Sequence, residues 1–290
     1  MNKKDGKTAF FFLLPLISLF LVFFLYPITR TIYLSFTDWM AVSPVRNFIG
    51  LTNYKNAFSD SNFLNAIKNT LIWTALYTTI SVGMGLLLAS LTFRIGRGAN
   101  LFKSILYYPL VLSFVVIGVL WSWMYDSQVG LINIFFRYIG LGSLTRNWLG
   151  DGNTALGAVI VAASWCQIPF CMVIFLAGLT TIPPELIEAA NVDGANFFQS
   201  FVHVTLPMLR NVSAVAISLT IMRSFKVFDL VYVMTKGGPF RSSEVIAHYM
   251  YFIAFKNFSF AYGCTMSILM GIFIFPIALI YIRKLSRAMI

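Results

Sequence analysis

Four polar side chains stand inside otherwise apolar stretches of the chain, and their types could do chemistry. They are Gln167, Arg223, Lys226 and Asp229. Charged and amide groups are costly in an apolar medium unless they face a cavity or a partner, so each is a candidate for ligand contact. Amide and guanidinium groups suit a hydroxyl-rich ligand. An alternative for Lys226 and Asp229 is structural, because nearly one helical turn separates them and they can pair with each other.

The sequence carries no signature of a catalytic or metal centre. Gly6, Lys7 and Thr8 match the end of a phosphate-binding P-loop, but no glycine stands five residues before Gly6. The two histidines, His203 and His248, are expected in loops and fit neither a Ser/His/Asp order nor an HExxH motif. We therefore predict no catalytic residue, no metal and no cofactor bound by this chain.

The cysteines are equally uninformative about chemistry. The chain has three, Cys166, Cys171 and Cys264, all in apolar stretches and none in a metal-binding spacing. We expect them to pack as small apolar residues.

The composition is that of an integral membrane protein. Hydrophobic residues make up 59% of the 290 residues and charged residues only 11%, whereas soluble domains carry roughly 25% charged residues. The formal charge of +11 could suggest a nucleic-acid partner. The basic residues lie at the ends of apolar blocks rather than on one face, which indicates membrane insertion and lipid contact and argues against nucleic acid.

The apolar residues form six blocks, each long enough to cross a bilayer as a helix of about 20 residues. The predicted spans are residues 9–33, 70–93, 104–125, 155–180, 212–234 and 260–282. The first follows Lys3, Lys4 and Lys7 as a signal peptide would, but it is too long and ends in no small-x-small site, so we predict a retained span. The expected fold is an all-α integral membrane protein with one transmembrane domain over residues 1–290.

Lys and Arg are denser in the segments that would face the cytoplasm if both termini lie inside. We therefore predict a multi-pass protein with cytoplasmic termini. The first outer connection, residues 34–69, is rich in aromatic residues, and we expect an interfacial aromatic belt or a structured lid there.

The cytoplasmic connection over residues 181–210 predicts a helical hairpin. Pro183 and Pro184 can open a helix, Glu185 suits the positive end of its dipole, and Gly194 can take the left-handed conformation that ends it. A second short helix should follow until Pro207 removes a backbone donor. Helices this short are marginal alone, so the hairpin needs a partner surface or tertiary contacts.

This hairpin resembles the EAA loop of the permease subunits of ATP-binding-cassette (ABC) importers. The matching residues are Glu188-Ala189-Ala190, Asp193-Gly194-Ala195 and Leu206-Pro207, in the family's order and spacing. The resemblance implies a type I importer permease fold. It also implies that the first short helix is a coupling helix seated on an ATPase subunit. The implied ATPase-coupling residues are Glu185, Glu188, Ala189, Ala190, Asp193, Gly194 and Ala195.

Further motifs resemble the carbohydrate permeases of the maltose and glycerol-3-phosphate group. They are the run Phe228–Pro239, Tyr26-Pro27, Ser35-Phe36, residues 48–54 and Asn69-Thr70. The likeness is greater to the larger maltose permease component, without its extra N-terminal spans and periplasmic insertion. Counting from the group's motifs places the implied substrate path at Cys166, Gln167, Phe170, Thr220, Arg223, Ser224 and Val227. Several of these side chains differ from the maltose pattern, so the sugar is left open.

The function implied by the resemblance is that of a permease subunit of an ATP-driven sugar importer in the bacterial cell membrane. The implied partners are a second, paralogous permease, a cytoplasmic ATPase dimer that binds ATP and Mg²⁺, an extracytoplasmic sugar-binding protein, the sugar and membrane lipid. The alternative is a stand-alone secondary transporter driven by an ion gradient, which Arg223, Lys226 and Asp229 would serve but which gives the hairpin no role. A membrane-embedded enzyme would need an acid/base or metal constellation that the sequence lacks.

Overall fold

The computed structural model describes residues 3–43, 46–94 and 99–288. Within these ranges the chain is helical, and its extended pairing is limited to one isolated β-bridge, between Thr37 and Phe48. The predicted all-α class is therefore confirmed. The chain divides into two compact units, one made of residues 1–61 and 250–271 and the other of residues 62–249 and 272–290. Arg97, which contributed to the predicted orientation, lies outside the described residues.

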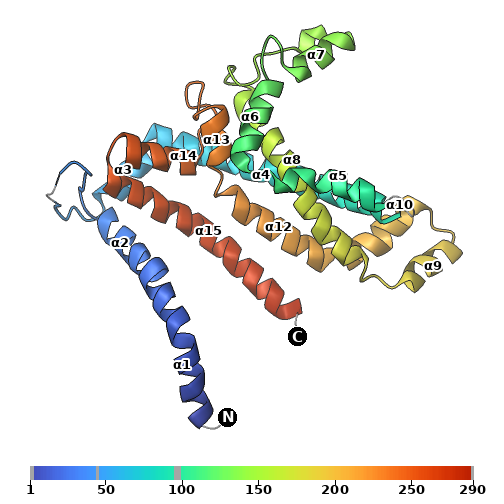
Figure 1. Cartoon of the computed structure of the whole chain (residues 1–290), viewed down its shortest axis with the longest axis horizontal. Helices are drawn as coiled ribbons and strands as arrows, with labels where there is room; N and C mark the ends of the chain where they lie inside the picture. The colour runs from blue at the N-terminus through green and yellow to red at the C-terminus, as the bar shows by residue number, and fades with distance from the viewer. Residues whose placement is uncertain (1–2, 44–45, 95–98, 289–290) are drawn as a thin grey trace. The chain divides into compact units, whose positions relative to one another are not determined.

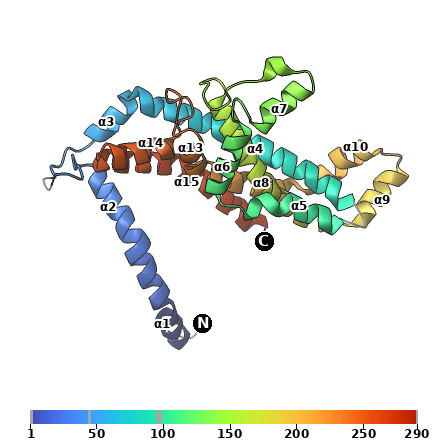
Figure 2. The same ribbon diagram turned by 45° about the horizontal axis from the view of Figure 1, so that its top comes forward.

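Most of the described residues lie in helices (Figures 1 and 2). In chain order these are α1 (Lys3–Phe20), the π-helical turn η1 (Leu21–Leu25), α2 (Tyr26–Ser35), α3 (Thr52–Ser59), α4 (Ser61–Arg94), α5 (Ala99–Val111), α6 (Phe114–Met124), α7 (Leu131–Tyr138), η2 (Gly142–Leu144) and α8 (Ala155–Leu179). They continue with α9 (Pro184–Val192), α10 (Phe197–Ser200), η3 (Phe201–Thr205), α11 (Leu206–Met208), α12 (Arg210–Ser224), α13 (Asp229–Met234), α14 (Ile246–Tyr251), η4 (Phe252–Lys256) and α15 (Phe260–Ala288).

Three helical stretches of the described chain are long and apolar enough to cross a membrane, and the number rises to five if each of two bent pairs counts as one span. The three are Phe12–Ser35, Ser61–Phe93 and Ala155–Leu179. The region of the predicted sixth span forms the first part of α15, where the apolar helix Phe260–Pro276 is shorter than a full span. The exact count of six is therefore not reproduced by helix length and composition.

The predicted third span, residues 104–125, is not one straight helix. It consists of α5 and α6, which meet at a bend of 106°. Pro109 near the end of α5 has no backbone N–H to continue the hydrogen-bond ladder. Ser113 then begins a new helix, because its side chain accepts a hydrogen bond from the backbone N–H of Val116.

The predicted fifth span, residues 212–234, is also broken. Helix α12 stops at Ser224, and α13 begins only at Asp229. The Ser224 hydroxyl is hydrogen-bonded to the carbonyl of Ile221, and the backbone then turns through short bonds from Lys226 N to Arg223 O and from Val227 N to Ser224 O. The sequence analysis expected one continuous span here, although Arg223, Lys226 and Asp229 interrupt its apolar pattern at the break.

Helix α8 is the centre of the larger unit. It packs against α5, α6, α12 and α13, and its side chains Val159, Met172 and Phe175 are fully buried. Gly85 of α4 lets that helix come close, because a Cβ there would lie 2.5 Å from Cys171 Cβ of α8. Helix α12 packs against α8, and Figure 1 shows both helices reaching the end of the larger unit that carries α9 and α10.

The smaller unit is organised around Asn53. This side chain is 8% exposed and donates hydrogen bonds from Nδ2 to the carbonyls of Ser35 (3.0 Å) and Thr37 (2.8 Å). Thr265 of α15 donates to the same Ser35 carbonyl. The outer connection that the sequence predicts as a belt or lid thus has ordered internal hydrogen bonds, whereas residues Phe12–Ser35 bury none of their apolar window.

Candidate functional site

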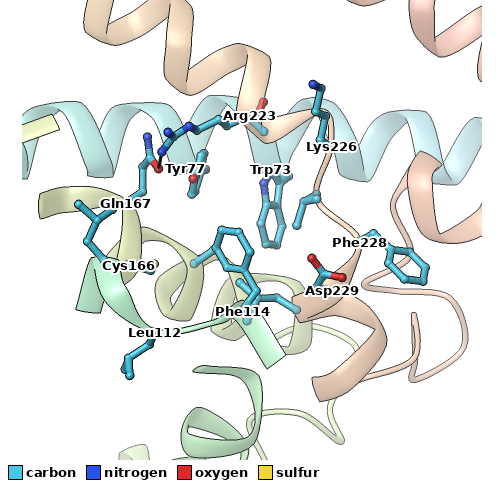
Figure 3. A pocket seen from close by; sticks show the side chains of 15 residues that line it. Trp73, Tyr77, Leu112, Phe114, Cys166, Gln167, Arg223, Lys226, Phe228 and Asp229 are labelled. Atoms are coloured by element: carbon cyan, nitrogen blue, oxygen red, sulfur yellow. Dashed lines mark hydrogen bonds between the residues drawn. The ribbon is translucent and has the colours of Figure 1, made fainter. Parts of the chain in front are cut away.

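A cavity of about 400 Å³ lies in the larger unit where α4, α8, the bend between α5 and α6, and the break between α12 and α13 come together (Figure 3). Both departures from straight helices therefore contribute to its wall. The lining residues are Trp73, Tyr77, Leu110, Leu112, Phe114, Ala163, Cys166, Gln167, Arg223, Ser224, Lys226, Val227, Phe228, Asp229 and Leu230. The wall is largely aromatic and aliphatic, with a few polar groups that can orient a ligand.

Most of the residues predicted for a substrate path meet at this cavity. Five of the seven line it: Cys166, Gln167, Arg223, Ser224 and Val227. The other two, Phe170 and Thr220, stand behind the wall, where each contacts a lining residue. The sequence-based set is thus brought together by the fold, although two members do not face the cavity.

Gln167 joins the two helices that supply most of this set. Its side chain is 3% exposed. It accepts a hydrogen bond at Oε1 from Arg223 Nη1 (3.1 Å) and donates from Nε2 to Thr220 Oγ1 (3.3 Å). The Arg223 guanidinium also lies over the ring of Phe170, 3.7 Å from the ring centroid. A cation so held by an amide and an aromatic face is stabilised without a carboxylate partner.

Ser224 connects α12 to a further helix. Its hydroxyl lies 2.8 Å from Thr74 Oγ1 of α4. Thr220, one turn earlier on nearly the same face, is fully buried and lies 3.4 Å from the sulfur of Cys171. These bonds fix α12 to both α4 and α8, which positions its C-terminal end at the cavity.

Lys226 and Asp229 do not form the internal pair that their spacing allowed. In the described part of the chain the Glu244 carboxylate pairs with Arg241 and contacts His248, whereas neither Lys226 nor Asp229 takes part in an ion pair. In Figure 3 the amino group of Lys226 points away from the other labelled side chains, and the carboxylate of Asp229 points in among them. Lys226 lies in the break between α12 and α13, and Asp229 begins α13, so the two side chains do not share one helix face.

Three aromatic residues of the wall were missed from the sequence: Trp73, Tyr77 and Phe114. Trp73 and Tyr77 lie one turn apart on α4, and their ring centroids are 6.0 Å apart. Trp73 is 1% exposed, and its indole N–H has no hydrogen-bond partner in the described part of the chain. Nothing distinguished them in the sequence from aromatic residues that face lipid, because a membrane span is apolar on every side.

The predicted cytoplasmic hairpin is present with the expected first helix. Helix α9 spans Pro184–Val192 and has no buried residue, and Gly194 adopts a φ of +83°. The backbone N–H groups of Asp193 and Ala195 donate to the carbonyls of Ala189 and Ala190, which closes the helix end. Glu185, Glu188, Ala189, Asp193 and Gly194 are exposed, and Ala190 and Ala195 are half-buried.

The second half of the hairpin also follows the prediction. Asn196 and Gln199 form a reciprocal capping box that starts α10. The helical run continues through the π-helical turn η3 and α11 and ends at Met208, one residue after Pro207, where the chain bends by 70° into α12. A hollow of about 390 Å³ lies within the hairpin, and His203 lines it in helical rather than loop structure.

A buried charged cluster, also missed, lies next to the glycine-rich turn after α13. The Glu244 residue is 3% exposed. Its carboxylate accepts a hydrogen bond from Arg241 Nη1 at 2.6 Å, and its other oxygen lies 2.9 Å from His248 Nδ1. Asn69 Nδ2 donates to the carbonyl of Glu244 at 3.0 Å. Gly237 has a φ of +80°, and a Cβ there would lie 3.0 Å from the His248 ring. The cluster thus fixes the turn to α4.

Comparisons with known proteins agree with this geometry. Residues 81–287 match the model of the family described as binding-protein-dependent transport system inner membrane component. A probable ABC transporter permease, YurN of Bacillus subtilis, is 33% identical over 98% of this chain and 97% of its own. The trehalose/maltose transport system permease MalF of Thermococcus litoralis is 29% identical over 98% and 95% of the two chains.

The fold also matches a solved structure. A chain of a bacterial ABC transporter that imports the acidic polysaccharide alginate aligns with a TM-score of 0.84, at 24% identity, over 98% of this chain and 96% of its own. The likeness extends over nearly the whole of both chains, so the two chains share a fold.

Proposed function

The chain belongs to the family of binding-protein-dependent transport system inner membrane components, and from this premise we propose how its two sites work together. The protein is a permease of an ABC importer. We propose that the cavity around Gln167 is its part of the path for a sugar or oligosaccharide, and that the hairpin of α9 couples this path to an ATPase.

The observation that carries the proposal is the connection between the two sites. Helix α8 runs from Gln167 at the cavity to Leu179, a few residues before the hairpin, and α12 returns from Arg210 to Ser224. At a rise of 1.5 Å per residue, the twelve residues from Gln167 to Leu179 span roughly 18 Å. Two packed helices thus link the hairpin mechanically to the cavity wall.

The chemistry of the cavity favours a hydroxyl-rich ligand. The ring of Phe114 can stack on the apolar face of a sugar ring, and the Asp229 carboxylate can hydrogen-bond its hydroxyl groups. The buried rings of Trp73 and Tyr77 complete an apolar wall. The name of the Thermococcus litoralis relative, a trehalose/maltose permease, supports a carbohydrate as cargo.

The hairpin has the properties of a docking element. Helix α9 has nine residues and no buried side chain, so it presents Glu185 and Glu188 freely to a partner. The partner in this proposal is a cytoplasmic ATPase dimer. It binds and hydrolyses ATP with Mg²⁺, while this chain has no catalytic role. The hairpin side of the larger unit is then cytoplasmic, as are both termini.

The remaining partners follow from the family. A second, paralogous permease supplies the other half of the path, and an extracytoplasmic binding protein delivers the sugar to the outer face of the bacterial cell membrane. A structure related in fold to this chain was solved as an alginate transporter in complex with its alginate-bound periplasmic protein, which supports this arrangement.

The test is purification of the protein from its native membrane, followed by uptake assays in proteoliposomes. We expect an ATPase and a second permease to copurify, and uptake to require ATP inside the vesicles and to survive a protonophore. Recovery of the chain alone, with uptake that a protonophore abolishes and ATP depletion does not affect, would contradict the proposal and favour an ion-driven transporter.

A further inference from the structure

Three charged side chains border the cavity, and their directions differ. Arg223 and Lys226 carry positive charge and Asp229 carries negative charge. In Figure 3 the Arg223 guanidinium turns toward Gln167 and the Lys226 amino group points away, while the Asp229 carboxylate faces the space between Trp73 and Phe114. The charge that meets a ligand in the middle of the cavity is therefore the negative one.

Arg223 and Asp229 also differ in the contacts that their side chains make. Arg223 is already engaged by Gln167 Oε1 at 3.1 Å and by the Phe170 ring at 3.7 Å. Within the described residues, Asp229 takes part in no ion pair and its side chain in no hydrogen bond. The Trp73 indole N–H, in the same wall, also has no partner. One unpaired acceptor and one unpaired donor thus border the cavity.

We propose that Asp229 makes this cavity selective for neutral, polyhydroxylated ligands and against sugars that carry a carboxylate or phosphate. A hydroxyl group donates to a carboxylate and also accepts from an N–H, so it can satisfy both Asp229 and Trp73. A carboxylate or phosphate has no proton to donate at neutral pH and is repelled by Asp229. This inference rests on the proposed function and deepens it by naming the substrate class.

The expected size of the effect follows from the setting. The cavity is partly solvated, so the repulsion between two unit charges a few ångströms apart is reduced but remains enough for a discrimination on the order of tenfold in affinity. The alginate transporter with which this chain shares its fold imports an acidic polysaccharide, so the common architecture does not itself impose the preference.

The test measures binding to the assembled permease–ATPase complex in detergent by isothermal titration. The probes form two matched pairs, each of a neutral disaccharide and its acidic counterpart. Mannobiose is paired with dimannuronate, and galactobiose with digalacturonate. Maltose and trehalose serve as further neutral sugars. We expect the neutral sugars to bind and each acidic partner to bind on the order of tenfold more weakly. Replacing Asp229→Asn should abolish that ratio, because the carbonyl of Asn still accepts a hydrogen bond and the charge is gone.

Two further variants sharpen the measurement. Trp73→Phe removes the N–H and keeps the aromatic face, so it should weaken neutral sugars about fivefold without changing the neutral-to-acidic ratio. Asp151→Asn removes a carboxylate that does not line the cavity and should leave the ratio as in the wild type.

Tighter binding of acidic sugars by the wild type, a ratio unaffected by Asp229→Asn, or no binding by any neutral sugar would each overturn this inference. None of these outcomes affects the proposed importer function, which fails only if ATP-dependent uptake and the copurifying ATPase are absent. The two proposals therefore fail separately.

Discussion

Arg223 Nη1 donates a hydrogen bond of 3.1 Å to Oε1 of Gln167, and this contact joins α12 to α8 at the cavity wall. The other end of the same amide donates to Thr220, also on α12. A single buried side chain of α8 therefore holds two successive turns of its neighbour.

The first prediction concerns this contact. Gln167→Leu should lower the affinity for the transported sugar and release Arg223, and a double-mutant cycle with Arg223→Met should give a coupling energy of about 1 kcal/mol. Binding titrations of the four proteins measure it, and strictly additive losses would contradict the geometry.

The turn of the hairpin provides the second prediction. At Gly194, with its φ of +83°, Val would be strained by roughly 1–2 kcal/mol, so Gly194→Val should uncouple ATP hydrolysis from uptake while the protein still inserts. Asn tolerates this backbone region, so Gly194→Asn is the matched control and should retain most uptake. Equal uptake by both variants would show that the turn is not needed.

Charge on α9 is the subject of the third prediction. Glu188→Lys reverses an exposed charge on the proposed ATPase-docking face and should reduce uptake at least about tenfold, whereas Glu188→Gln should have a smaller effect. Copurification of the ATPase, measured beside uptake, distinguishes weakened docking from a fault in transport. If the Lys variant takes up sugar normally, Glu188 has no place in the coupling.

The close approach of α4 and α8 leads to a fourth prediction. A Cβ at Gly85 would lie 3.0 Å from the backbone N of Met172 as well as against Cys171, so Gly85→Val should destabilise the protein by about 1–3 kcal/mol and lower its melting temperature. Gly83→Ala is the control on the same helix, since a Cβ there meets nothing within 4 Å. Similar melting temperatures for the two variants would be inconsistent with this packing.

The buried cluster beside the glycine-rich turn gives a fifth prediction. Glu244→Ala leaves Arg241 and His248 without their shared carboxylate and should cost about 3–5 kcal/mol of stability. Glu244→Gln keeps hydrogen bonding and should cost less. Thermal unfolding in detergent measures the stability of both variants. An unchanged melting temperature in the Ala variant would show that the cluster does not stabilise the turn.

The parts of the fold that sequence predicted well are those with local causes. Pro184 at the first turn of α9 and the left-handed Gly194 after it set the first helix and its end by backbone sterics alone. Pro207 likewise stands one residue before the end of the second helical run at Met208, whereas the π-helical turn η3 inside that run has no signal in the sequence.

The breaks inside spans were missed although part of their cause is local. Pro109 and the Ser113 cap precede α6, and Arg223, Lys226 and Asp229 interrupt the apolar sequence around Ser224. Contacts from other helices matter at both places: Thr74 meets the Ser224 hydroxyl, and Cys166 donates to the carbonyl of Pro109.

The candidate site was predictable where polarity marked it. Gln167, Arg223 and Asp229 stand out in apolar surroundings, and the fold brings all three to the cavity. Trp73 and Phe114 do not stand out, because an aromatic ring is as acceptable to lipid as to a ligand. Their contribution required knowing which face of α4 and which side of the α5–α6 bend point inward.

The double hydrogen bond of Gln167 has a mechanical consequence. The Gln167 amide is hydrogen-bonded to both Thr220 and Arg223. We therefore expect α8 and α12 to move as one rigid body when the ATPase displaces the hairpin. Any motion of the cavity wall would then fall at its other border, the 106° bend between α5 and α6. Phe114, at the start of α6 and in the cavity wall, is the side chain that such a motion would carry toward or away from Gln167.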